Sequence, residues 1–259
     1  MIEKINRIIS KKNKSKLVCL TAYSKNIAKI LDKYIDIILV GDSMANVLYG
    51  HKNTHNISLD NIIQHTQSVK KGTNKSLLVV DMPMGTYNNI KSAITNAKLI
   101  IKQTKCDAVK IENNKKNYKI IEALVKKRIP VMGHIGYTPQ FKKSFRVEGQ
   151  TKKTKFKLLM EAKKIERAGA FSIVLECLSP SAAKLITKEL NIPTIGIGSS
   201  SNCDGQILVT DDMLGISGFY PKFVKKYINL KSIIEKAVKK YTRDVKLNKF
   251  PSTKNFLNE

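Results

Sequence analysis

The chain has 259 residues, and 42% of them are hydrophobic, which is enough to bury the core of one large domain. It contains no run near the roughly 18 apolar residues of a membrane span and no signal-peptide pattern, so we expect a cytoplasmic protein without a membrane partner. The formal net charge of +27 suggests nucleic-acid binding, but only five of the 47 basic residues are arginines and the charge is spread along the chain, so we expect no nucleic-acid partner.

The first half of the chain alternates short apolar runs with amphipathic helical patterns after a basic lead-in at 1–15. Ser58 is a candidate N-cap, and the loop at 44–58 is long enough to form a wall of an active site. The predicted strands are 16–22, 37–40, 76–81 and 108–112, and the predicted helices are 25–33, 58–71, 89–105 and 115–127.

The second half continues the alternation, except for a polar segment at 137–150 that has no helical period. The predicted strands are 130–136, 171–176, 193–198 and 205–212, and the predicted helices are 152–168, ending at Gly169, then 181–190 and 220–241. Eight strands alternating with helices predict one domain over 1–259, a (β/α)₈ TIM barrel with a basic N-terminal lead-in and a basic C-terminal helix and tail. A doubly wound open sheet is the alternative.

The four cysteines are widely separated and form no CxxC pair, which argues against a disulfide framework or a structural zinc site. We expect them to be reduced packing residues. They are Cys19, Cys106, Cys177 and Cys203.

Four of the predicted strands end in an acid, namely Asp42, Asp81, Glu112 and Glu176. Parallel barrel strands place their carboxyl ends on one face, so we expect these acids to converge there. Asp42, Asp81 and Glu112 end three successive strands, and three like charges in a cleft repel one another unless a cation lies among them. Hard oxygen ligands of this kind suit Mg²⁺. The alternative is that each acid is only a helix cap or a salt-bridge partner.

Three further side chains, Lys110, Glu176 and His134, are candidates for binding or catalysis at the same face. Lys110 lies two residues before Glu112, so both side chains leave the strand on one side, where the lysine needs anionic partners. Glu176 follows a mostly apolar stretch, which raises a carboxyl pKa and suits a general base or acid, although a solvated rim glutamate is the alternative. His134 could bind a substrate or donate to an acid.

Nine short motifs follow one another along the chain over about residues 16–245. They are Leu20-Thr21-Ala22-Tyr23, Val40-Gly41-Asp42-Ser43, Asp81-Met82-Pro83, Val109-Lys110-Ile111-Glu112, Gly133-His134-Ile135-Gly136, Thr138-Pro139-Gln140, Leu175-Glu176-Cys177, Ile195-Gly196-Ile197-Gly198 and Cys203-Asp204-Gly205-Gln206. Each motif is short, but the ordered set is specific, and it resembles that of the ketopantoate hydroxymethyltransferase (3-methyl-2-oxobutanoate hydroxymethyltransferase) family.

The resemblance implies a barrel of the phosphoenolpyruvate/pyruvate-related superfamily. It also implies transfer of a one-carbon unit from 5,10-methylenetetrahydrofolate to 3-methyl-2-oxobutanoate, giving 2-dehydropantoate, an early step towards pantothenate and coenzyme A. It implies a homo-oligomer, in this family commonly a decamer. By matching motif, Asp42 and Asp81 resemble Mg²⁺ ligands, with Glu112 bound directly or through water. The same matching implies that Asp42, Ser43, Asp81 and Lys110 contact the keto acid and that Glu176 is the proton acceptor.

Two alternatives remain beside this enzyme. One is another Mg²⁺-dependent lyase of the same superfamily acting on a 2-oxo acid, and the other is a basic nucleic-acid-binding protein. The chain departs from the family's usual pattern at positions that include no predicted catalytic residue, namely Ser24, Ala45, Tyr137, Ser199, Ser200, Asp211 and a shortened segment at 141–150.

Overall fold

The computed structural model describes residues 1–114, 117–142, 144–218 and 220–256, and eight parallel strands in it close into a barrel in sequence order. The predicted barrel is confirmed, and the open sheet is excluded because β1 pairs with β8. The strands are β1 (Leu17–Thr21), β2 (Ile37–Val40), β3 (Leu77–Asp81), β4 (Ala108–Glu112), β5 (Val131–Gly136), β6 (Ser172–Glu176), β7 (Thr194–Ile197) and β8 (Gly205–Leu208).

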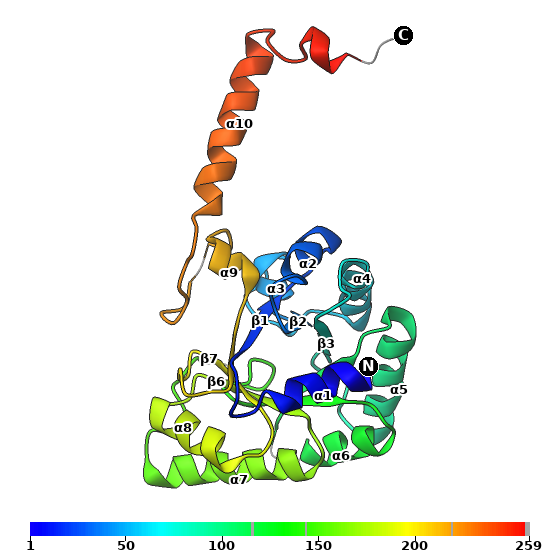
Figure 1. The fold of residues 1–259 in the computed structure, drawn as a ribbon, viewed down its shortest axis with the longest axis vertical. Helices are drawn as coiled ribbons and strands as arrows, with labels where there is room; N and C mark the ends of the chain where they lie inside the picture. The colour runs from blue at the N-terminus through cyan, green and yellow to red at the C-terminus, as the bar shows by residue number, and fades with distance from the viewer. Residues whose placement is uncertain (115–116, 143, 219, 257–259) are drawn as a thin grey trace. The chain divides into compact units, whose positions relative to one another are not determined.

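Helices lie outside the barrel between successive strands from β1 to β7, as Figure 1 shows, while a loop without a helix joins β7 to β8. Ser58 caps α4 as predicted, accepting a hydrogen bond from the backbone N–H of Asn61. Gly169 adopts a positive φ of 91° after α7, which is the conformation expected of a glycine just past a helix. The helices of this region are α2 (Lys25–Leu31), α3 (Met44–Val47), α4 (Leu59–Lys70), α5 (Ile90–Thr104), α6 (Tyr118–Lys126), α7 (Lys152–Arg167) and α8 (Pro180–Glu189).

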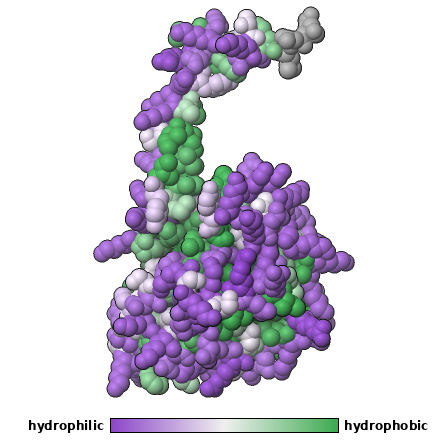
Figure 2. Space-filling model, viewed as in Figure 1, coloured by the Kyte–Doolittle hydropathy of each residue, from purple (hydrophilic) through white to green (hydrophobic). Residues whose placement is uncertain are grey.

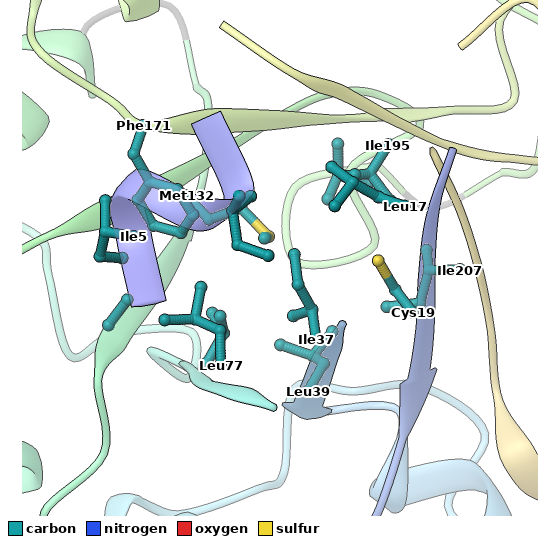
Figure 3. Packing of buried hydrophobic residues seen from close by; sticks show 14 residues of the cluster. Ile5, Leu17, Cys19, Ile37, Leu39, Leu77, Met132, Phe171, Ile195 and Ile207 are labelled. Carbon is teal, nitrogen blue, oxygen red and sulfur yellow. The ribbon is translucent and has the colours of Figure 1, made fainter. Parts of the chain in front are cut away.

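The basic lead-in forms helix α1 (Ile2–Ser10), whose buried residues Ile5 and Ile8 belong to the same apolar cluster as the first residues of several strands. Figure 3 shows Ile5 among Leu77, Phe171 and Met132. The helix therefore closes the amino end of the barrel with apolar contacts. All four cysteines are buried and free, as expected.

Two predicted elements, a loop and a strand, differ from the structure. The loop at 44–58 begins with the one-turn helix α3, and the predicted strand 205–212 stops at Leu208, before helix α9 (Thr210–Leu214). Asp211 and Asp212 lie in the first turn of α9, where acidic side chains favour a helix over a strand.

The predicted helix 220–241 begins later, because Asn229 caps α10 (Leu230–Lys246) through the backbone N–H of Ser232. The start of predicted helix 115–127 falls on residues 115 and 116, which lie outside the described residues.

The chain divides into two compact units, Met1–Thr210 and Asp211–Glu259. The second holds α10 and the short 3₁₀-helix η1 (Thr253–Asn255). No residue of α10 is buried, and apolar side chains gather along it (Figure 2), namely Ile233, Ile234, Val238, Tyr241 and Val245. In the described parts of the chain, no helix is both long and apolar enough to cross a membrane.

Candidate active site

The carboxyl ends of the strands gather the predicted acids as the barrel geometry requires. Asp42 and Asp81 are adjacent, since the backbone N–H of Asp42 donates to Oδ2 of Asp81 at 3.0 Å. Glu112 is 1% exposed, and the side chain of Glu176 is 15% exposed. Gln140 bonds to both Asp42 and Glu112, and His134 lies against both Glu112 and Glu176, so the four acids converge at one rim as expected.

The strand register explains which side chains become neighbours. Asp81 on β3 is paired with Lys110 on β4, and the Lys110 ammonium lies 2.7 Å from Oδ1 of Asp81. Both side chains are almost fully buried, so the ion pair satisfies two charges that would be costly alone. The pKa of Lys110 is raised, because the surrounding acids, first of all Asp81, outweigh the opposing effect of burial. The lysine therefore remains charged at neutral pH.

Burial and crowding raise the pKa of two acids in this cluster. The pKa of Asp42 rises to about 7, first through burial and then through the charge of Asp81. The pKa of Glu112 lies well above its ordinary value for the same first reason and because of the Asp42 charge. One lysine therefore does not balance the acids around it, and the site favours an additional cation.

Glu176 and His134 form a second group beside this cluster. Nε2 of His134 lies 3.2 Å from Oε2 of Glu176, and its Nδ1 lies 3.7 Å from Oε1 of Glu112. Burial raises the pKa of Glu176 to about 8 and lowers that of His134 well below its ordinary value. The imidazole is therefore neutral at pH 7. It lies on β5, between Glu112 and Glu176.

One predicted substrate contact lies beside a second hydroxyl group. The Ser43 hydroxyl, predicted to contact substrate, lies 2.9 Å from the Tyr23 hydroxyl. Outside the acid cluster, His51 stacks on Tyr49, and Nε2 of His55 lies 3.1 Å from the Pro139 carbonyl oxygen.

Two residues of the site were not predicted. Gln140 follows β5 and contacts both Asp42 and Glu112, while the Tyr87 hydroxyl donates to its side-chain oxygen. Gln140 lies in one of the motifs that carried the family resemblance, and this was the only signal that could have pointed to it. Tyr87 belongs to no such motif.

The donor chemistry suits a hard cation. Asp42 and Asp81 supply adjacent carboxylates, and Mg²⁺ in proteins is commonly held by one or two carboxylates with substrate and water oxygens in the other positions. Within the described ranges, no group of three His, Cys, Asp or Glu side chains has the arrangement of a metal site. The assignment of Asp42, Asp81 and Glu112 as ligands therefore stays a prediction, which the preference of Mg²⁺ for carboxylate oxygens favours.

A closed parallel barrel with buried acids and a charged lysine at the carboxyl ends of its strands defines a TIM-barrel enzyme. The model of the ketopantoate hydroxymethyltransferase family matches residues 3–253. The chain belongs to this family.

Relatives and solved structures agree with this assignment. A 3-methyl-2-oxobutanoate hydroxymethyltransferase of Pelagibacter ubique is 50% identical over 98% of this chain and 99% of its own length. The enzyme of the same name from Anaplasma marginale is 46% identical, covering 97% of this chain and 92% of its own.

Two solved structures share the fold at low sequence identity. A 2,3-dimethylmalate lyase, described as a member of the PEP mutase/isocitrate lyase superfamily, has a TM-score of 0.66 at 14% identity, over 93% of this chain and 87% of its own. A phosphonopyruvate hydrolase, solved with oxalate and Mg²⁺, has a TM-score of 0.63 at 11% identity, over 97% of this chain and 92% of its own. Both likenesses show the same barrel fold.

Proposed function

We propose that the chain transfers a hydroxymethyl unit from 5,10-methylenetetrahydrofolate to 3-methyl-2-oxobutanoate, giving 2-dehydropantoate on the route to pantothenate and coenzyme A. Its relatives carry the name of this reaction at up to 50% identity over nearly the whole chain. The structural observation that supports it is the buried Asp42–Asp81–Lys110 group. Beside it, His134 lies between Glu112 and Glu176, and burial raises the pKa of Glu176 to about 8.

The acid cluster is the proposed binding place of the cation and the keto acid. Asp42 and Asp81 would hold Mg²⁺, with Glu112 bound directly or through water. A bound Mg²⁺ supplies a Lewis acid that withdraws electrons from the keto group and so makes the C3 hydrogen more acidic. Lys110 and Ser43 contact the keto acid, the lysine supplying positive charge for its anionic groups.

Glu176 is the proposed proton acceptor. The glutamate accepts the C3 proton, and the electron pair of the broken C–H bond forms a new bond from C3 to the methylene carbon of the folate. The two bonds between that carbon and the folate nitrogens break, and water supplies the hydroxyl group of the product. The C3 proton and the remaining water proton go to the two nitrogens, which gives tetrahydrofolate. A carboxyl with a pKa near 8 is a stronger base than an exposed glutamate, which is the property that proton removal from carbon requires.

The remaining expectations belong to the same proposal. We propose that the chain works as a homo-oligomer in the cytoplasm, as a single functional domain over residues 1–259, with no membrane or nucleic-acid partner. The phosphonopyruvate hydrolase of the same fold was solved with Mg²⁺ and oxalate, which is consistent with a cation and a small carboxylate at such a rim.

The test is direct. Purified protein is incubated with Mg²⁺, 3-methyl-2-oxobutanoate and 5,10-methylenetetrahydrofolate, and product formation is followed by nuclear magnetic resonance. We expect 2-dehydropantoate with the folate, and exchange of the C3 hydrogen with solvent deuterium without it. Cleavage of a 2-oxo acid in place of hydroxymethyl transfer would favour the lyase alternative. Duplex DNA binding that falls steeply between 50 and 200 mM salt, in a protein without transferase activity, would favour the nucleic-acid alternative.

A further inference from the structure

Gln140 connects three neighbouring strand ends of the active-site rim. Its backbone N–H donates to Oε2 of Glu112 at 3.0 Å, and its side-chain Nε2 donates to Oδ2 of Asp42 at 2.8 Å. The same Nε2 donates to the carbonyl oxygen of Met82 at 3.1 Å. Gln140 itself is 2% exposed, so these bonds form out of contact with water. Groups at the carboxyl ends of β2, β3 and β4, namely two carboxylates and a backbone carbonyl, are thereby bonded to one residue that follows β5.

The orientation of the Gln140 amide is determined by its partners. The Tyr87 hydroxyl donates to Oε1, while Nε2 has two acceptors, one of them a carboxylate oxygen. A flipped amide would place its carbonyl oxygen against Asp42 and the Met82 carbonyl, leaving both without a donor. The side-chain oxygen of Gln140 therefore acts as an acceptor and the side-chain nitrogen as a donor.

The Gln140 amide determines which carboxylate oxygen of Asp42 remains for a ligand. Gln140 occupies Oδ2, which leaves Oδ1 for a cation. Hydrogen bonds from outside a ligand set commonly orient ligating carboxylates and tune their affinity for a metal. The contact to Glu112 is made by the backbone, so it survives a change of the Gln140 side chain.

We propose that Gln140 is a positioning residue for the cation and keto acid, acting through Asp42, with Tyr87 holding its amide in the working orientation. This inference rests on the proposed function. It goes beyond the acids and the lysine by assigning a role to an uncharged residue of the loop after β5.

The test compares Gln140→Met with the wild-type protein by calorimetric titration of Mg²⁺, with and without 3-methyl-2-oxobutanoate. Methionine keeps the length of the side chain but has no amide. We expect Mg²⁺ affinity to fall by roughly 10- to 100-fold, with saturating Mg²⁺ restoring most of the C3 exchange rate and leaving the KM of the folate unchanged. Wild-type Mg²⁺ affinity in a folded Gln140→Met protein would overturn the proposal.

Gln67→Met is the matched control. Gln67 is an exposed residue of the outer helix α4 whose side chain donates only to the Gln103 carbonyl oxygen at 3.3 Å among the contacts of the described residues. We expect its Mg²⁺ affinity to equal that of the wild type. A fall equal to that of Gln140→Met would mean that loss of any glutamine amide has this effect, and the proposal would fail.

If Gln140→Met does not fold, Tyr87→Phe tests the positioning role of Gln140 in its place. It keeps Gln140 but removes the donor to Oε1, and we expect Mg²⁺ affinity to fall roughly three- to tenfold, the value of one hydrogen bond. An unchanged affinity would overturn the positioning role. If the wild type binds Mg²⁺ but makes no product, the proposed function fails, while the comparison of affinities still tests Gln140.

Discussion

Replacement of Glu176 by glutamine tests its role as the proposed base. We also expect this replacement to raise the folding stability of the protein at pH 8. Glutamine has the shape of the neutral acid and can still meet Nε2 of His134, which lies 3.2 Å from Oε2. It cannot accept a proton from carbon, and general bases contribute about 10²- to 10⁴-fold to rate. We expect Mg²⁺-dependent deuterium exchange at C3 of 3-methyl-2-oxobutanoate, measured without folate, to fall by at least that lower bound.

The stability change follows from the pKa of Glu176, which burial raises from its ordinary value near 4.5 to about 8. Between these values the unfolded chain gives up its proton while the folded chain keeps it, so folding loses free energy as pH rises. The loss reaches about 1.4 kcal/mol per pH unit and at most about 5 kcal/mol above pH 8. Glutamine has no such loss, so the variant should be more stable than the wild type at pH 8 and similar to it below pH 4.5.

The assay is urea unfolding of both proteins from pH 5 to pH 9 with a chelator present, since a bound cation would lower the pKa of Glu176. Asp42 and Glu112 titrate in both proteins, and loss of the Glu176 charge removes one cause of their raised pKa values, so the difference between the two curves contains Glu176 and its effect on these two acids. Parallel stability curves would refute the raised pKa. Undiminished exchange in the folded variant would remove Glu176 from the role of base.

Further predictions concern the cation pair, the buried lysine and the barrel wall. Asp42→Asn should weaken Mg²⁺ binding at least tenfold in calorimetry, and an unchanged affinity would contradict its role as a ligand. Asp81→Ala leaves the Lys110 ammonium buried without its partner and should cost about 3–5 kcal/mol in urea unfolding, whereas Asp81→Ala with Lys110→Met should recover most of this loss; equal stability of the two would show that the charge is not the cause. Gly133→Ala would place a Cβ 2.5 Å from Cγ2 of Ile165 and should cost about 1–3 kcal/mol. In a double-mutant cycle Ile165→Ala should reduce that cost, and strictly additive losses would argue against the clash.

Elements predicted from strong local patterns agree with the structure to within one or two residues. The run 108–112 is β4 without change, because β-branched residues buried on both faces fix a parallel strand. The final helix was placed wrongly at its start, since its apolar period extends through residues that Asn229 excludes by capping α10. Periodicity locates a helix well and its ends poorly, because ends depend on single hydrogen bonds.

For the site, the sequence by itself determined the acids, the lysine and their common face. An acid that ends a buried parallel strand must lie at the carboxyl rim of a barrel, so Asp42, Asp81 and Glu112 could be grouped without coordinates. The family motifs added their proposed roles.

Only the tertiary structure decided which of these groups touch. Strand register places Lys110 beside Asp81, and barrel closure brings Gln140 to Asp42, ninety-eight positions away in the chain. Hydrogen bonds between such distant residues leave no periodic trace in a sequence, because periodicity reports which face a side chain shares with its near neighbours. The apolar stretch before Glu176 predicted the direction of its pKa shift, whereas the value of about 8 depends on burial in the folded protein.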